Sequence, residues 1–158
     1  MAVPIHTTRT IDAPADAVWA VLDDFADISA WSAGIQNSYT TGDGVTATGL
    51  GAERRCELGA GKILDEKISA YTEGESMTVD VWNVEGLPLR SSRATFSVRS
   101  IGEGRSEATV DAEAVPKMPG FLVALMRPVL SRAFAKNFSG LLDELATEAV
   151  ARSASGRS

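Results

Sequence analysis

Apolar side chains recur at every second residue through most of this chain and at helical spacing near its two ends. Residues 3–11 are rich in β-branched side chains, and the alternation predicts a strand whose buried face holds Val3, Ile5 and Ile11. Asp12 is placed to cap a helix, and Pro14 suits its first turn. A second short helix is expected over 27–31. The apolar residues of the first helix follow at helical spacing: Val18, Trp19, Leu22 and Phe25.

Between residues 35 and 115, short alternating segments are separated by clusters of turn-forming residues. The clusters contain glycine and lie at 42–44, 59–61, 73–75, 86–88 and 102–104. Such spacing is typical of an antiparallel meander, here of about six strands.

After Pro116 the apolar residues return to helical spacing and keep it to about residue 151. Pro128 is expected to kink this helix or to separate its first two turns. Residues 152–158 are small and polar, and we expect a flexible tail there. The apolar face of the helix, which we expect to cover the sheet, consists of Phe121, Leu122, Leu125, Val129, Phe134, Phe138, Leu141, Leu142 and Leu145.

These elements predict one α+β domain over residues 1–151: a strand, two short helices, a six-stranded meander and a long helix. A chain of 158 residues suits a single domain. Small side chains, mainly alanine and serine, occupy many inward positions of the strands near 92–98 and 108–114. One helix cannot fill the volume that they leave, so we expect an enclosed apolar cavity.

Composition and charge narrow the range of partners. The chain is 44% hydrophobic with a formal charge of −6 and an isoelectric point near 4.8, which argues against nucleic acid and against tight docking on anionic membranes. The first ten residues lack the segments of a secretion signal, and no stretch approaches the length of a membrane span. We therefore expect a cytoplasmic protein without integral membrane association.

The few nucleophilic and metal-ligating side chains exclude several kinds of chemistry. His6 is the single histidine, and its parity places it on the solvent face of the first strand, so neither a histidine-dependent triad nor a histidine metal site is expected. Cys56 is the single cysteine and is expected to be an inert core thiol. The glycine patterns at 42–47 and 56–63 lack essential features of nucleotide-binding motifs. We expect no metal and no cofactor.

Several short motifs resemble those of a known superfamily. Ile11-Asp12-Ala13-Pro14, with Val18-Trp19 and residues 22–31 after it, is similar to the N-terminal signature of the START-like SRPBCC superfamily. Gly51-Ala52-Glu53-Arg54-Arg55, Gly61 and Glu66-Lys67-Ile68 resemble its third and fourth strands, and 141–145 resembles the end of its long helix. The likeness covers nearly the whole chain and implies the helix-grip fold. The superfamily includes polyketide cyclase/dehydrase and lipid-transport-like proteins, so the resemblance implies no single activity.

The glycine loop at 59–61 sets the expected register of the central hairpin. If Leu58 faces Lys62 across a three-residue loop, then Arg54 faces Glu66. The other pairs are Cys56 with Leu64 and Ala52 with Ile68. Their apolar members indicate the inner face, so Arg54 and Glu66 are expected to meet at the cavity, and the resemblance independently implies an inward Glu66.

Two interpretations of this ion pair stay open. The pair either only fixes the register, or it orients the polar end of a ligand, with Glu66 as a general acid/base beside Arg54 as a variant. Which face of residues 77–84 lines the cavity also stays open. The remaining candidate ligand-binding residues are Cys56, Leu58, Leu64, Ile68, Ser92, Phe96, Val110, Ala112, Met118, Leu122 and Met126.

Three functions are compatible with this pattern. The first is binding or transport of a hydrophobic small molecule, lipid or polyketide-like, in the cavity. The second is a polyketide cyclase/dehydratase-type enzyme that uses Glu66 with Arg54. The third is a protein-interaction module, which requires a large exposed apolar patch that the sequence does not show clearly. We favour binding, because the expected cavity is poor in titratable groups.

Overall fold

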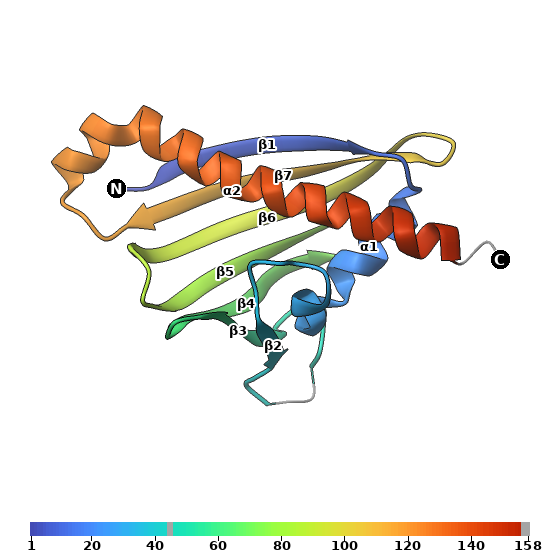
Figure 1. The fold of residues 1–158 in the computed structure, drawn as a ribbon, viewed down its shortest axis with the longest axis horizontal. Helices are drawn as coiled ribbons and strands as arrows, with labels where there is room; N and C mark the ends of the chain where they lie inside the picture. The colour runs from blue at the N-terminus through green and yellow to red at the C-terminus, as the bar shows by residue number, and fades with distance from the viewer. Residues whose placement is uncertain (44–45, 156–158) are drawn as a thin grey trace.

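One seven-stranded antiparallel sheet and one long helix dominate the computed structural model, which describes residues 1–43 and 46–155 (Figure 1). The strands pair in the order β1-β7-β6-β5-β4-β3-β2, which confirms the predicted α+β helix-grip fold. The predicted turn at 42–44 falls partly outside the described residues. In chain order the elements are β1 Val3–Ile11, α1 Ala15–Asp23, the 3₁₀ helix η1 Phe25–Ala30, β2 Asn37–Thr40, β3 Glu53–Gly59, β4 Lys62–Thr72, β5 Ser76–Glu85, β6 Leu89–Gly102, β7 Arg105–Pro116 and α2 Gly120–Ser155.

Alternation on β1, β6 and β7 creates the inner face of the sheet. On β1 the predicted residues Val3, Ile5 and Ile11 are buried. On β6 and β7, Phe96 pairs with Val110. The other inward residues of these two strands are buried as their parity predicts: Ala94, Val98, Ala108, Ala112 and Ala114.

The predicted cap of the first helix is wrong. Pro14 occupies the N-cap position of α1 in an extended conformation, and no side chain caps the helix. Asp12 instead lies within 3.3 Å of Arg105, at an exposed position. Phe25 does not end α1 but begins η1, so the second helix begins earlier than the expected residue 27.

The β3–β4 hairpin has the predicted register at its centre and a different one at its tip. Arg54 pairs with Glu66 as expected, but Lys62 pairs with Gly59 instead of Leu58. Ala60 and Gly61 both have positive φ, which makes a two-residue turn, and the register shifts between residues 57 and 59. The expected three-residue loop is therefore wrong.

The structure also shows which face of β5 points inward. Met77, Val79 and Val81 are buried, whereas Trp82 is 60% exposed. Glu66 pairs with Val81 and Asp65 pairs with Asn83, so Trp82 has no partner on β4.

Helix α2 is continuous through Pro128 and longer than predicted. It extends to Ser155. Arg152 stabilises its last turn by ion pairs with Glu148 of the same helix at 2.9 Å and with Asp24, the residue after α1, at 3.5 Å. The expected flexible tail from residue 152 is thus wrong for residues 152–155. Residues 156–158 lie outside the described part of the chain.

Only the second half of the predicted apolar face of α2 covers the sheet. Leu142 and Leu145 are buried, but Phe121, Leu125 and Val129 are 73%, 77% and 61% exposed. Figure 1 shows the reason, because the first turns of α2 project beyond the end of the sheet near the N-terminus. The expectation that these three residues cover the sheet is wrong. Within the described residues, no helix combines the length and apolar character that crossing a bilayer requires.

Candidate functional site

A buried ion pair joins the two central strands on the inner face. Arg54 of β3 and Glu66 of β4 are directly opposite, with Nε and Oε2 2.5 Å apart. Their side chains are only 8% and 12% exposed. The predicted pair is confirmed, and its low exposure means that both charges have lost most of their hydration.

Phe25, the first residue of η1, contacts Arg54 on the side away from Glu66. The guanidinium donates through Nη1 to the backbone oxygen of Phe25 at 2.6 Å and lies 3.9 Å from the centroid of the Phe25 ring. A cation on an aromatic face and a charge-assisted hydrogen bond both stabilise the buried charge. The sequence predicts Phe25 only as a core residue, and no sequence signal links its carbonyl to Arg54.

Cys56 completes this cluster as a donor to Glu66. Its Sγ lies 3.3 Å from Glu66 Oε2, and the thiol is buried. Burial, and then the Glu66 charge, raise the pKa of the Cys56 thiol far above its usual range, against an opposing effect of Arg54. The thiol is therefore protonated at neutral pH, and a protonated thiol is not a nucleophile.

The protonated state of Cys56 predicts slow alkylation of the folded protein. At mildly alkaline pH we expect iodoacetamide to leave the native thiol unmodified, because both thiolate and access are lacking. The same sample in urea should react at the rate of a simple thiol, which is measured by mass spectrometry. A native rate equal to that of glutathione would contradict this account.

The inner space between the sheet and the helices contains a small void beside Arg54. Its volume is about 20 Å³, close to the space that one water molecule needs. Typical ligand pockets are on the order of 300–1,000 Å³, so the expected cavity is not open to this extent in the structure. The void is lined by residues of six elements, among them Ile28, Trp31, Arg54, Met77, Phe96 and Leu141.

Trp31, which also lines this void, has an unsatisfied donor. Its indole Nε1 is buried and has no hydrogen-bond partner among the described residues. A buried donor without an acceptor is costly and uncommon in folded proteins. No sequence signal reveals this unsatisfied donor, because the lack of a partner for Trp31 Nε1 depends on tertiary structure alone.

The candidate ligand-binding residues do not all gather at this void. Arg54 and Phe96 line it, whereas Ile68, Val110, Ala112 and Cys56 are buried elsewhere in the interior. Leu58, Leu64 and Leu122 are half-buried. Met118 borders a surface hollow, and Met126 is 38% exposed. Ser92 is half-buried and borders another hollow, but it keeps its predicted inward parity, because it pairs with the buried residues Val81 and Ala114.

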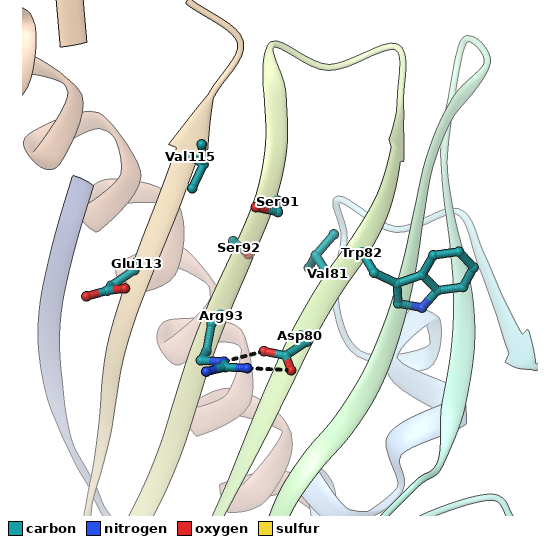
Figure 2. A pocket seen from close by; sticks show the side chains of 8 residues that line it. All are labelled: Asp80, Val81, Trp82, Ser91, Ser92, Arg93, Glu113 and Val115. Carbon is teal, nitrogen blue, oxygen red and sulfur yellow. Dashed lines mark hydrogen bonds and ion pairs between the residues drawn. The ribbon is translucent and has the colours of Figure 1, made fainter. Parts of the chain in front are cut away.

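Two larger hollows are open to solvent. Figure 2 shows the one on the outer face of β5, β6 and β7, where Arg93 and Asp80 form a paired contact beside the exposed Trp82. The two bonds measure 2.6 and 3.1 Å, and Arg93 holds the pKa of Asp80 below its usual value. The other hollow, of about 510 Å³, is lined by Arg90, Lys117, Met118 and Pro119. Neither belongs to the apolar interior.

Comparisons with known proteins agree with this architecture. The structure superposes on the Zhui aromatase/cyclase from Streptomyces sp. R1128 with a TM-score of 0.76 and 15% identity, covering 96% of each chain. A START superfamily protein from Mycobacterium smegmatis gives a TM-score of 0.76 and 14% identity, covering 93% of this chain and 97% of the other. A norcoclaurine synthase variant from Thalictrum flavum gives 0.70 and 17%, covering 96% of each.

These identities are low, so the superpositions show the fold alone. No curated protein sequence matches the chain. The sequence profile of the family described as polyketide cyclase / dehydrase and lipid transport matches residues 2–150. Because that match covers almost the entire chain, the protein belongs to the polyketide cyclase/dehydrase and lipid transport family.

Proposed function

We propose that the protein binds a hydrophobic small molecule, lipid or polyketide-like, between the sheet and α2, with the polar end of the ligand at Arg54 and Trp31. The observation that carries the proposal is the combination of donors at the void. Arg54 uses two of its five N–H groups on Glu66 and Phe25, and the Trp31 indole has an unsatisfied N–H. An oxygen of a carboxylate, carbonyl or phenol could accept from both.

The separation of α2 from half of the sheet supports this placement. Its Cα atoms come within 8 Å of β1, β7 and α1 but, in the described part of the chain, not of β3 to β6. Side chains bridge the gap instead, as Phe96 and Phe138 do with ring centroids 6.4 Å apart. The ligand would therefore occupy a conformation in which these side chains or α2 move apart, and its binding would select that conformation.

The geometry favours binding over acid/base catalysis. Arg54 borders the void, whereas Glu66 does not. Glu66 Oε2 already accepts hydrogen bonds from Arg54 and Cys56. A general acid or base must come within hydrogen-bond reach of the substrate. Glu66 would first have to exchange these two partners, so we assign it the role of holding Arg54.

Native mass spectrometry and a fluorescent fatty acid test the proposal. Freshly purified protein should carry a small molecule that is lost on denaturation, and it should bind cis-parinaric acid with energy transfer from tryptophan. The double variant Arg54→Met/Glu66→Leu removes both charges and keeps similar volumes, so it should stay folded. We expect its affinity for cis-parinaric acid to fall about tenfold or more, through loss of a charge-assisted hydrogen bond.

The variant Phe121→Ser/Leu125→Ser is the matched control, because both side chains are exposed and the first turns of α2 lie far from β3 (Figure 1). It should bind cis-parinaric acid like the wild type. The proposal fails if no molecule co-purifies and the probe does not bind. It also fails if only the control variant loses binding, because the probe would then occupy the surface.

A further inference from the structure

The first turns of α2 carry large apolar side chains on the side that faces solvent. Phe121, Leu125 and Val129 follow at four-residue spacing, so they lie along one side of the helix, and Met126 lies beside them at 38% exposure. We call these four residues the apolar stripe. Exposed apolar groups of this size, gathered in one place, mark contact sites on proteins. The sequence does not show this exposed patch clearly, because helical spacing does not reveal which turns of α2 the sheet leaves uncovered.

Cationic side chains surround the apolar stripe. Residues 114–142 contain four cations and no acidic residue, although the whole chain has a formal charge of −6. Arg132 and Lys136 continue the stripe at three- and four-residue spacing, and Arg127 lies within it in sequence. We define the cationic cluster as these three residues with Lys117 and Arg90, and all five are exposed.

The cationic cluster differs from the other cations because it lacks acidic partners. Among the described lysines and arginines, eight form ion pairs, and apart from Lys62 those that form none belong to this cluster. Arg90 and Lys117 come from different segments but line the same hollow with Met118 and Pro119. The backbone N–H of Lys117 donates to Pro88 O at 3.1 Å, which holds the two segments together.

We propose that this end of the molecule docks on anionic lipid membranes, with the apolar stripe inserted at the headgroup boundary and the cationic cluster on the lipid phosphates. A helix that lies in the interface needs an apolar face flanked by lysine and arginine, which is the arrangement at the start of α2. The formal charge of −6 argues against docking through the acidic remainder of the surface, which would be repelled, but it does not describe this end, where cations predominate. Only this end can therefore approach the bilayer. The positive end of the α2 dipole adds to the attraction.

Charge also argues against a second copy of the chain as the occupant. Two apolar stripes facing each other would bring two cationic clusters together, and like charges at an interface disfavour association. The first turns of α2 project beyond the end of the sheet, a shape that suits a flat bilayer surface (Figure 1).

Vesicle flotation tests the proposal with the full chain. The wild type should bind vesicles of phosphatidylcholine mixed with phosphatidylglycerol, should not bind phosphatidylcholine alone, and should dissociate in high salt. Phe121→Ser/Leu125→Ser should abolish binding. Arg132→Gln/Lys136→Gln should weaken it by about fivefold for each cation removed. Lys62→Gln removes an exposed, unpaired cation from the β3–β4 hairpin and should bind like the wild type.

Three results would overturn the proposal. The first is no binding to the mixed vesicles, and the second is an equal loss in the Lys62→Gln control. The third is a dimer in sedimentation velocity that Phe121→Ser/Leu125→Ser dissociates, which would assign the stripe to self-association. Because circular dichroism and cis-parinaric acid binding are measured on the same samples, a failure of docking is distinguishable from a failure of interior binding.

Discussion

Replacing Arg54 with methionine should lower the free energy of unfolding by about 3–5 kcal/mol, the usual cost of leaving one charge of a buried pair uncompensated. Glu66 is 12% exposed and, among the described residues, would keep only the Cys56 thiol as a side-chain donor. The ring of Phe25 would also lose its cationic partner, and its carbonyl would lose a donor. Urea denaturation at neutral pH, followed by circular dichroism, measures the change.

Two variants show that the cost comes from the unpaired carboxylate. Arg54→Met/Glu66→Leu should regain most of the lost stability, because neutral side chains of similar volume need no hydration. Arg99→Met breaks an ion pair with Glu107 on the same sheet, but Arg99 is 68% exposed, so we expect a change of about 0.5 kcal/mol or less. Equal losses for Arg54→Met and Arg99→Met would show that the buried pair has no special role.

The central hairpin shows how far sequence patterns can determine the site. Because side chains alternate between two faces, an error of one residue in register would place Arg54 and Glu66 on opposite faces. Apolar partners at 52, 56, 64 and 68 exclude that register, and the observed pairing agrees. The tip is less determined, since a glycine at 59 permits a bulge that changes the partner of Lys62 without changing any buried contact.

Contacts between distant elements could not be predicted in this way. The position of η1 above β3 decides that Phe25 binds Arg54, and no periodicity encodes it. The alanines of β6 and β7 correctly indicate a narrow inner wall, but they do not show how far Trp31, Met77 and Phe96 reach into the space that is left. Small wall residues therefore predicted a larger cavity than the structure contains.

The same limit applies to α2. Helical spacing identifies the apolar face of the helix, but it does not show which turns of that face lie over the sheet. That depends on where β7 ends and the helix begins, and the first turns lie beyond the covered region (Figure 1). A chain with Phe121, Leu125 and Val129 exposed therefore has the same periodicity as one with them buried.

One substitution made at two places on α2 tests this division. Leu145→Ala should lower the free energy of unfolding by about 2–5 kcal/mol, because Leu145 is 1% exposed in the core cluster and its loss leaves a cavity. Leu125→Ala should change it by about 0.5 kcal/mol or less, since Leu125 is 77% exposed. Urea denaturation of both variants at neutral pH measures the contrast, and the helix propensity of the substitution is the same in each.

The contrast has a consequence for the surface as well as for the core. If Leu125 contributes nothing to stability, its apolar surface stays in contact with water in the folded chain. Burying that surface in a contact outside the chain would then still be favourable. If Leu125→Ala instead costs as much as Leu145→Ala, the first turns of α2 are packed in solution. The apolar stripe would then be part of the core, and membrane docking through it would lose its physical basis.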